Sequence, residues 1–102
     1  MVYLKIMKTK TSPCPITKVV LLLSDAWTMM ILYQLNTKSM RFCELERALN
    51  GISTRTLTLK LHKLIEEDMV TKDALGMYMT TKRGKGLRII KKAMRRYEET
   101  YL

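Results

Sequence analysis

Residues 42–64 of the chain read FCELERALNGISTRTLTLKLHKL, and this stretch carries the strongest structural signals in the sequence. In its first part, 43–49, apolar residues recur at helical spacing, and Asn50 with Gly51 forms a strong helix-stop signal. Ser53 is then a suitable N-cap for a second helix, whose buried side is formed by three leucines. These leucines are Leu57, Leu61 and Leu64. The stretch therefore predicts two helices joined by a short turn.

The opposite side of the second helix has the chemistry that a major-groove reader needs. Arg55 can pair with guanine O6 and N7, while Thr58 and Leu59 can offer methyl groups to thymine. Ser53 and Thr54, at the helix start, can bind phosphates through hydroxyls and backbone N–H groups. An apolar Leu59 on this side fits an ordinary solvated face poorly, so we expect DNA contact here.

Three further residues extend this candidate DNA-binding set. His62 and Lys63 lie on the same side of the helix, although His62 could equally be a plain surface polar residue. Arg41 precedes the first helix and is a candidate phosphate contact, with a salt bridge to Glu44 or Glu46 as the alternative.

Two helices are predicted before this pair. Residues 15–23 have apolar side chains at helical spacing after an early proline, and a second helix over 25–35 follows the N-cap signal Ser24-Asp25. Residues 36–39 form a polar break. Arg41 and Phe42 then either start a short strand or lead directly into the next helix.

A hairpin and a long helix are predicted after the pair. Residues 70–74 and 77–80 are short extended runs around Leu75 and Gly76, which indicates a tight hairpin. Residues 82–102 read as one long helix with an apolar heptad stripe that so short a chain has little surface to cover. We expect this stripe to form a dimer interface of Leu87, Ile90, Met94, Tyr97 and Tyr101.

This order of elements predicts a mainly α fold with a small β-hairpin. A short helix, a glycine-containing turn and a polar-faced helix followed by a hairpin are the layout of a winged helix-turn-helix, although a plain helical bundle would show similar periodicities. The predicted organisation is a basic N-terminal arm at 1–13, a winged-helix DNA-binding domain at 14–81 and a C-terminal dimerisation helix at 82–102.

The charge balance favours a polyanionic partner. The 102 residues include 19 Lys or Arg and 9 Asp or Glu, which gives a net charge of +10. Residues 81–96 alone contain eight cations and no acid. A single basic run is usually a solvated helix face, but three separate basic segments together indicate binding to a polyanion.

Several other classes of protein are not supported. Two cysteines and one histidine are too few for a disulfide scaffold or a Cys/His zinc site, so we expect no metal or cofactor. No activated nucleophile or carboxylate dyad indicates an enzyme. The apolar run 19–35 is interrupted by Asp25, and Pro13 and Pro15 precede it, which argues against a membrane span or a signal peptide. We expect a cytoplasmic protein.

Short motifs occur in a fixed order over about three quarters of the chain. They are Cys14-Pro15, Trp27-Thr28, Arg41-Phe42 with Glu44-Leu45, Gly51-Ile52-Ser53 with Arg55, Leu57, Leu61 and Leu64, and finally Tyr78, Thr81, Gly84 and Leu87. In this order they resemble the HxlR family of winged-helix transcriptional regulators, which are relatives of the MarR group. The resemblance implies a DNA-binding regulator, and it aligns Cys14 with a cysteine that acts as a redox switch in some members.

The chain also departs from the family pattern. Ser24-Asp25-Ala26 stands where the family usually has Gly-Gly-Lys, which removes a positive charge. Asp68 stands where a glycine is expected after the recognition helix, although Asp adopts a left-handed turn less easily. The hairpin is shorter than the family's wing and lacks its proline-bearing tip, so contact between wing and groove is an open question.

Together these observations predict a homodimeric transcriptional regulator, a repressor or dual regulator, that binds specific double-stranded DNA sequences. One alternative is a basic RNA-binding or ribosome-associated module that uses the helix containing residues 82–96. Another is a dimeric adaptor without nucleic acid. The effector, whether a small molecule or a redox signal, is left open.

Overall fold

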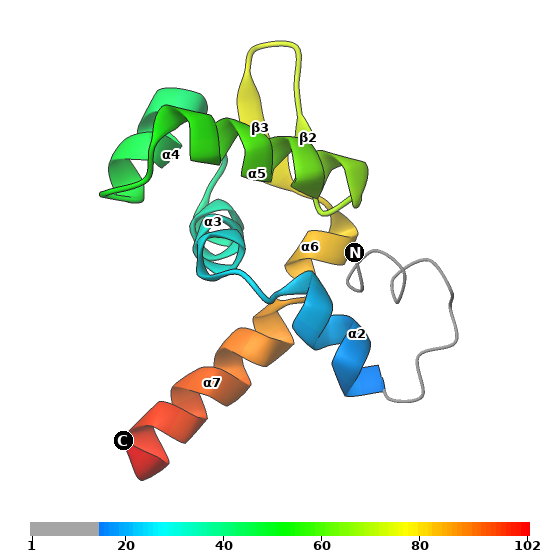
Figure 1. The fold of residues 1–102 in the computed structure, drawn as a ribbon, viewed down its shortest axis with the longest axis vertical. Helices are drawn as coiled ribbons and strands as arrows, with labels where there is room; N and C mark the ends of the chain where they lie inside the picture. Colours follow the sequence, from blue (N-terminus) through cyan, green and yellow to red (C-terminus); the bar gives the residue numbers. More distant parts are fainter. Residues whose placement is uncertain (1–14) are drawn as a thin grey trace.

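The computed structural model of the protein describes residues 15–102 and is drawn in Figure 1. The predicted arm at 1–13 and the candidate sensor Cys14 lie outside the described residues. In chain order the elements are α2 (Pro15–Leu22), α3 (Ala26–Thr37), β1 (Met40–Arg41), α4 (Phe42–Ala48), α5 (Thr54–Glu66), β2 (Val70–Lys72), β3 (Met77–Thr80), α6 (Lys82–Lys85) and α7 (Arg88–Tyr101). The mainly α class with a small β-hairpin is confirmed.

The strands form one antiparallel sheet in the order β1-β3-β2. Met40 of β1 pairs with Tyr78 of β3, and Val70 of β2 pairs with Thr80 on the other side of β3. The predicted hairpin is therefore the β2–β3 pair, which is the wing. Both interpretations of Arg41 and Phe42 hold in part, because the short strand β1 ends at Arg41 and α4 begins at Phe42.

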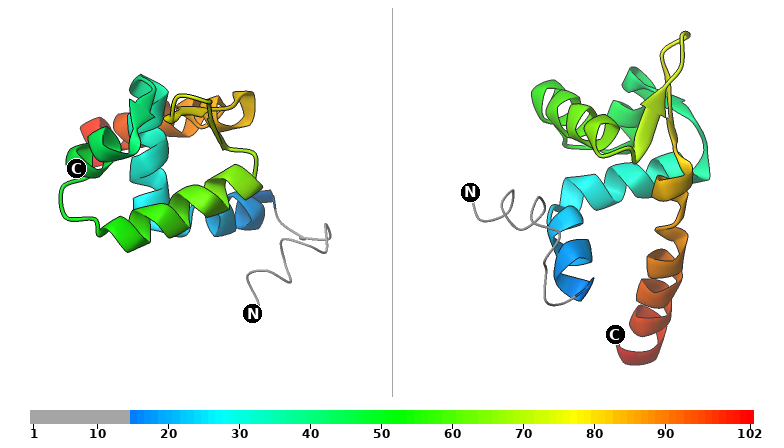
Figure 2. Two further views of the ribbon diagram at one scale, coloured as in Figure 1. Left: turned by 90° about the horizontal axis from the view of Figure 1, so that it is seen from above. Right: turned by 90° about the vertical axis from the view of Figure 1, so that its right-hand side faces the viewer.

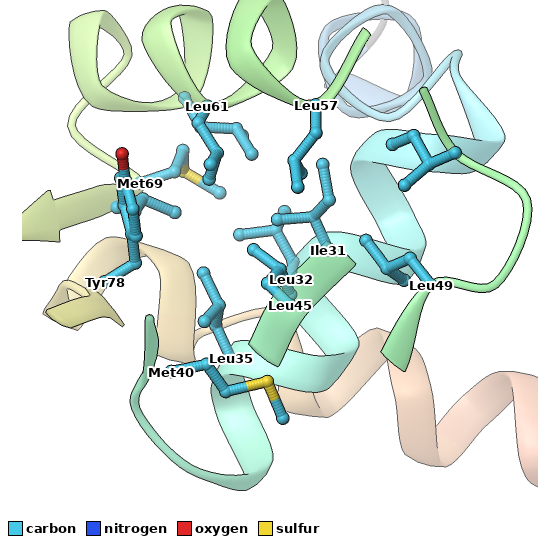
Figure 3. Close-up of a cluster of buried hydrophobic side chains, with 13 residues drawn as sticks. Ile31, Leu32, Leu35, Met40, Leu45, Leu49, Leu57, Leu61, Met69 and Tyr78 are labelled. Atoms are coloured by element: carbon cyan, nitrogen blue, oxygen red, sulfur yellow. The ribbon is translucent and has the colours of Figure 1, made fainter. Parts of the chain in front are cut away.

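The core lies where α3, α4 and α5 meet the sheet (Figure 3). Its buried side chains are Ile31, Leu32, Leu35, Met40, Leu45, Leu49, Ile52, Leu57, Leu61, Leu64, Met69, Val70 and Tyr78. The three α5 leucines are at most 2% exposed, which confirms the buried side predicted for this helix. Burial of each such side chain contributes about 1.5–3 kcal/mol relative to exposure.

The helices start at the predicted caps. The Asp25 carboxylate accepts a hydrogen bond from the Trp27 N–H at 2.9 Å and so begins α3. Ser53 Oγ accepts one from the Thr56 N–H at 3.0 Å and begins α5. The apolar run 19–35 is therefore divided between α2 and α3. None of the helices between residues 15 and 102 is long and apolar enough to cross a membrane.

The prediction of one helix over 82–102 was wrong. The short α6 ends at Lys85, and α7 begins only at Arg88. Gly86 lies at the break, and glycine is a poor helix former. Gly84 also packs so closely that an added Cβ would collide with the Met69 carbonyl oxygen. This close contact with Met69 fixes the position of α6, and α7 begins after the break as a separate helix.

Asp68 adopts the left-handed turn that the family usually gives to glycine, with φ of 59°. The Met69 N–H donates to the Leu64 carbonyl at 2.9 Å, and the Asp68 N–H donates to the Ile65 carbonyl at 3.1 Å. This pair of bonds is a Schellman ending for α5. Thr81 Oγ1 also donates to the Asp68 carbonyl at 2.6 Å, which ties the turn to the start of α6.

The elements are spread along the long axis of the molecule (Figure 1). α4, α5 and the wing gather at one end, whereas α7 extends from the other end. The side view in Figure 2 shows α3 crossing between these two ends, with α2 and α7 both on its far side from the wing. This arrangement, with its three-stranded sheet, is a winged helix-turn-helix and confirms the predicted fold class.

Candidate nucleic-acid interface

α5 presents one polar face to solvent. Arg55, Thr58 and His62 are exposed on it, and the side chain of Leu59 is 58% exposed. Lys63 is exposed as well. The structure thus brings the predicted base-reading residues together on the side of α5 that faces away from the core, at the end of the molecule that carries the wing (Figure 1).

Hydrogen bonds already engage the hydroxyl groups at the start of α5. Ser53 Oγ donates to Thr56 Oγ1 at 2.8 Å, and Thr54 Oγ1 donates to Glu46 Oε2 at 2.5 Å. Thr58 Oγ1 donates to the Thr54 carbonyl at 2.8 Å. A phosphate would have to replace Glu46 as the partner of Thr54, whereas the hydroxyl bond of Thr58 leaves its methyl group available.

The backbone N–H of Arg41 takes part in the start of α4, separately from any phosphate contact of its side chain. Its N–H donates to Glu44 Oε1 at 3.0 Å, so the carboxylate of Glu44 caps the first turn of α4. Among the described residues, the Arg41 guanidinium forms no ion pair with Glu44 or Glu46. The alternative of a local salt bridge is therefore not realised, and the exposed guanidinium stays available to a phosphate.

Lys60 is a cation of α5 that faces inward. Its ammonium forms an ion pair with the Asp25 carboxylate, and both side chains are about 30% exposed, at 32% and 27%. Burial raises the pKa of the Asp25 carboxyl, but hydrogen bonds from Lys60 and from the Trp27 N–H, together with the charge of Lys60, outweigh it and hold the pKa below its usual range. Asp25, which stands where the family usually has its second glycine, thus serves as a partner for the recognition helix.

A basic groove lies between the start of α4 and the β2–β3 wing. It has a volume of about 530 Å³ and includes Arg41, Arg47 and Lys72, with Glu44 as its acidic member. Sequence reasoning missed Arg47 and Lys72. Only the antiparallel pairing of β1, β2 and β3 brings the wing beside α4, so no local pattern in the sequence marks these two residues.

The tip of the wing is a poor match for a DNA groove. Asp73 Oδ1 accepts hydrogen bonds from the Leu75 and Met77 N–H groups, each at 2.9 Å, and so organises the turn. Gly76 completes the turn with φ of +85°. The tip thus presents a 72% exposed Leu75 beside a carboxylate, and the cation of the wing, Lys72, ends β2 directly before this turn.

The predicted dimer stripe is partly covered by the body of the domain at its start and exposed toward the end of α7. Leu87 and Ile90 are half-buried, but Met94 and Tyr101 are 55% and 72% exposed and Tyr97 is exposed as well. α2 adds a second exposed apolar surface. Its exposed residues are Ile16, Val19 and Val20.

No group of three or more His, Cys, Asp or Glu residues within 15–102 could hold a metal ion. Cys43 is exposed in the basic groove. Within residues 15–102, the polar face of α5 and the basic groove beside α4 are therefore the best candidate for a functional site.

Comparisons with known proteins agree with this geometry. Residues 22–102 match the family described as HxlR-like helix-turn-helix. The HTH-type transcriptional regulator YvaP of Bacillus subtilis is 37% identical over 81 residues, which cover 72% of this chain and 75% of YvaP. The HTH-type transcriptional regulator sll1512 of Synechocystis is 33% identical over 95 residues, which cover 87% of this chain and 70% of the relative.

Solved structures give the same result. Quinone-bound YodB from B. subtilis superposes with a TM-score of 0.80 at 25% identity, covering 86% of this chain and 99% of YodB. A protein assigned to the MarR family of transcriptional regulators, from Porphyromonas gingivalis W83, superposes with a TM-score of 0.79 at 26% identity, covering 93% and 99%. The chain belongs to the HxlR-like helix-turn-helix family of transcriptional regulators.

Proposed function

We propose that the protein is a homodimeric repressor that reads a specific duplex DNA sequence with α5. The observation that carries this proposal is the two-sided character of that helix. Its leucines are buried, while Arg55 and the 58% exposed Leu59 stand on the opposite side with no described residue covering them. A helix with such a face can enter the major groove and contact base edges.

The reading surface would combine direct and backbone contacts. Arg55 is assigned to a guanine, and Thr58 and Leu59 to thymine methyl groups. Arg41, Arg47 and Lys72 would hold phosphates along the groove between α4 and the wing. The groove contains these three cations and only one carboxylate, that of Glu44, which caps α4. His62 and Lys63 would extend the contact beyond the bases that Arg55 reads.

Dimerisation would cover the apolar surfaces of α7 and α2. A two-fold dimer places two α5 helices on one side of the duplex, so half-sites should repeat at about 10 base pairs or a multiple. A dimer bound to both half-sites within a promoter would exclude other proteins from the same stretch of DNA. This exclusion is the simplest route to repression. On the family resemblance, Cys14 would sense the signal that releases the repressor from DNA.

Selection of bound fragments from random duplex DNA tests this function most directly. We expect enrichment of a sequence with two related half-sites. If the dimer neutralises 6–10 phosphates, its affinity should fall by roughly 10³–10⁵ between about 50 and 200 mM salt. No enrichment, or tighter binding to single-stranded RNA at the same ionic strength, would favour the RNA-binding alternative.

A further inference from the structure

One face of α7 carries four cations in register. Arg88, Lys91, Lys92 and Arg95 follow the spacing i, i+3, i+4, i+7, which places them on one side of a helix. They line a hollow of about 360 Å³ together with Asn36 and Thr37 at the end of α3. No carboxylate lines this hollow, so the cations converge on an open space that would suit an anion.

These charges are not neutralised within the described chain. Between residues 15 and 102, none of the four cations forms an ion pair. The ammonium of Lys91 lies over the Tyr33 ring, 4.7 Å from its centroid, which leaves its charge in place. Glu98 and Glu99 follow only in the last turn of the helix. The four cations repel one another, and a bound polyanion would offset this repulsion.

The duplex read by α5 does not explain this face. α5 and the wing lie at one end of the molecule, while α7 extends from the opposite end (Figure 1). A helix of 14 residues is about 21 Å long, so α7 carries its cations well away from the reading surface.

The dimer stripe does not cover this face either. At about 100° per residue, the centre of the four cations lies roughly 130° around α7 from the centre of the five-residue stripe. A second copy that packs on the apolar stripe would therefore leave most of the cation face open to solvent.

We propose that this α7 cation face, formed by Arg88, Lys91, Lys92 and Arg95, binds the phosphate backbone of a second duplex DNA segment. Sequence-independent binding needs only cations that can neutralise phosphates. The proposal extends the proposed function and depends on it only for the identity of the first segment. A protein bound at its site would thereby hold a neighbouring stretch of duplex as well.

The face suits duplex better than single-stranded nucleic acid. Single strands are bound by combining cations with exposed aromatic rings on which bases stack. Tyr97 and Tyr101 point away on the apolar side of α7, and Lys91 lies over the Tyr33 ring. The Tyr33 ring is 46% exposed, but the Lys91 ammonium already occupies one side of it, so phosphate contact is the main interaction that this face offers.

A two-duplex capture assay on the full-length chain tests the proposal. An immobilised duplex with the selected site holds the protein, and a fluorescent duplex of unrelated sequence is then added. Arg88→Gln/Arg95→Gln should bind the immobilised duplex to within about twofold of the unmodified protein but capture at least about tenfold less of the second duplex, because two phosphate contacts are lost. Lys18→Gln/Arg83→Gln removes the same charge outside the hollow and should capture normally.

Equal capture by the two double variants would overturn the proposal, since it would mean that only net charge matters. So would a loss of single-stranded RNA binding in Arg88→Gln/Arg95→Gln with capture of the second duplex intact. Failure of the proposed function is separate, because it would show as absent sequence preference on the first duplex in the unmodified protein. Circular dichroism and thermal unfolding confirm that both variants keep the fold.

Discussion

The Lys60 ammonium of α5 forms an ion pair with the Asp25 carboxylate, and that same carboxylate caps α3. The recognition helix is thus tied to the first turn of the central core helix by a single acid. A position where the family usually carries a glycine thus holds the carboxylate that joins these two helices. Lys60 therefore adds to the basic composition of α5 without adding to its DNA-facing charge.

The ion pair should make stability depend on pH. Because the fold lowers the pKa of Asp25, the pair stabilises the protein above the unfolded carboxyl pKa of about 4, and this contribution is lost as pH falls through the folded pKa. We expect Lys60→Met to lower the free energy of unfolding by about 0.5–1.5 kcal/mol at neutral pH. Urea unfolding should show this difference shrinking toward zero near pH 2.

Two controls separate this pair from general charge effects. Asp25→Asn keeps an N-cap and should show little of the pH dependence. Lys38→Met removes an exposed lysine and should leave the unfolding free energy almost unchanged. A loss for Lys60→Met that is as large near pH 2 as at pH 7 would point to packing of the side chain instead of its charge.

Asp68 offers a stabilising substitution. Its φ of 59° is unfavourable for a residue with a Cβ, and Asp68→Gly removes that cost at the price of a more flexible unfolded chain. We expect a net gain of about 0.5–1 kcal/mol, which is the scale of such backbone effects. Thermal unfolding measures it. Asp68→Ala keeps the Cβ and loses the polar group, so it should be less stable than the unmodified protein.

The sequence predicted those elements whose signals are local. The caps Asp25 and Ser53 and the α5 leucines follow from spacing and hydrogen-bonding chemistry within a few residues. The break between α6 and α7 was missed because the heptad stripe starting at Leu87 outweighed the two glycines before it. Gly84 is required there by a contact with Met69, a residue from the other side of the wing.

The candidate site could be predicted in the same partial way. The exposed face of α5 follows from helical periodicity, since the positions opposite buried leucines must face outward. Arg47 and Lys72 come together with Arg41 only through strand pairing, which no local pattern encodes. The exposed apolar face of α2 was also unforeseen, because its spacing is the same whether a core or a partner covers it.

Cys14 should respond to oxidants if it is the sensor. A sensing thiol titrates below the ordinary cysteine pKa of about 8.5, because the thiolate is the reactive form. Mild peroxide should then change the DNA affinity of the unmodified protein and leave that of Cys14→Ser unchanged, as measured by fluorescence anisotropy. Cys43→Ser is the matched control. Cys43 is exposed to the oxidant, and we expect Cys43→Ser to keep the response of the unmodified protein. An equal response in Cys14→Ser and the unmodified protein would exclude Cys14.

The α7 stripe should hold the dimer together. Ile90→Glu/Met94→Glu places two carboxylates in the expected interface and should give monomers that bind DNA weakly, because each monomer keeps only one reading helix. Sedimentation at micromolar concentration measures the state. Lys92→Glu/Arg96→Glu changes charge away from the stripe and should remain dimeric. A monomer for the unmodified protein under these conditions would show that the stripe has another role.

Arg55 and Arg47 should separate base reading from phosphate binding. Arg55 projects from the first turns of α5, away from Leu57 and Leu61, where a guanidinium can reach a base edge. Arg55→Ala should cost about 1–3 kcal/mol on the selected site and relax the choice of base at one position per half-site.

Arg47→Ala is the matched change in the groove beside α4. It should weaken specific and non-specific binding alike and reduce the salt slope by about one per lost contact, with the base preference unchanged. Titrations of both variants over a salt series, on selected and scrambled duplexes, measure the two effects. If Arg55→Ala kept both its affinity and its base preference, α5 would not read bases through Arg55. If Arg47→Ala altered base preference, the groove would act on the orientation of α5 and not on a phosphate.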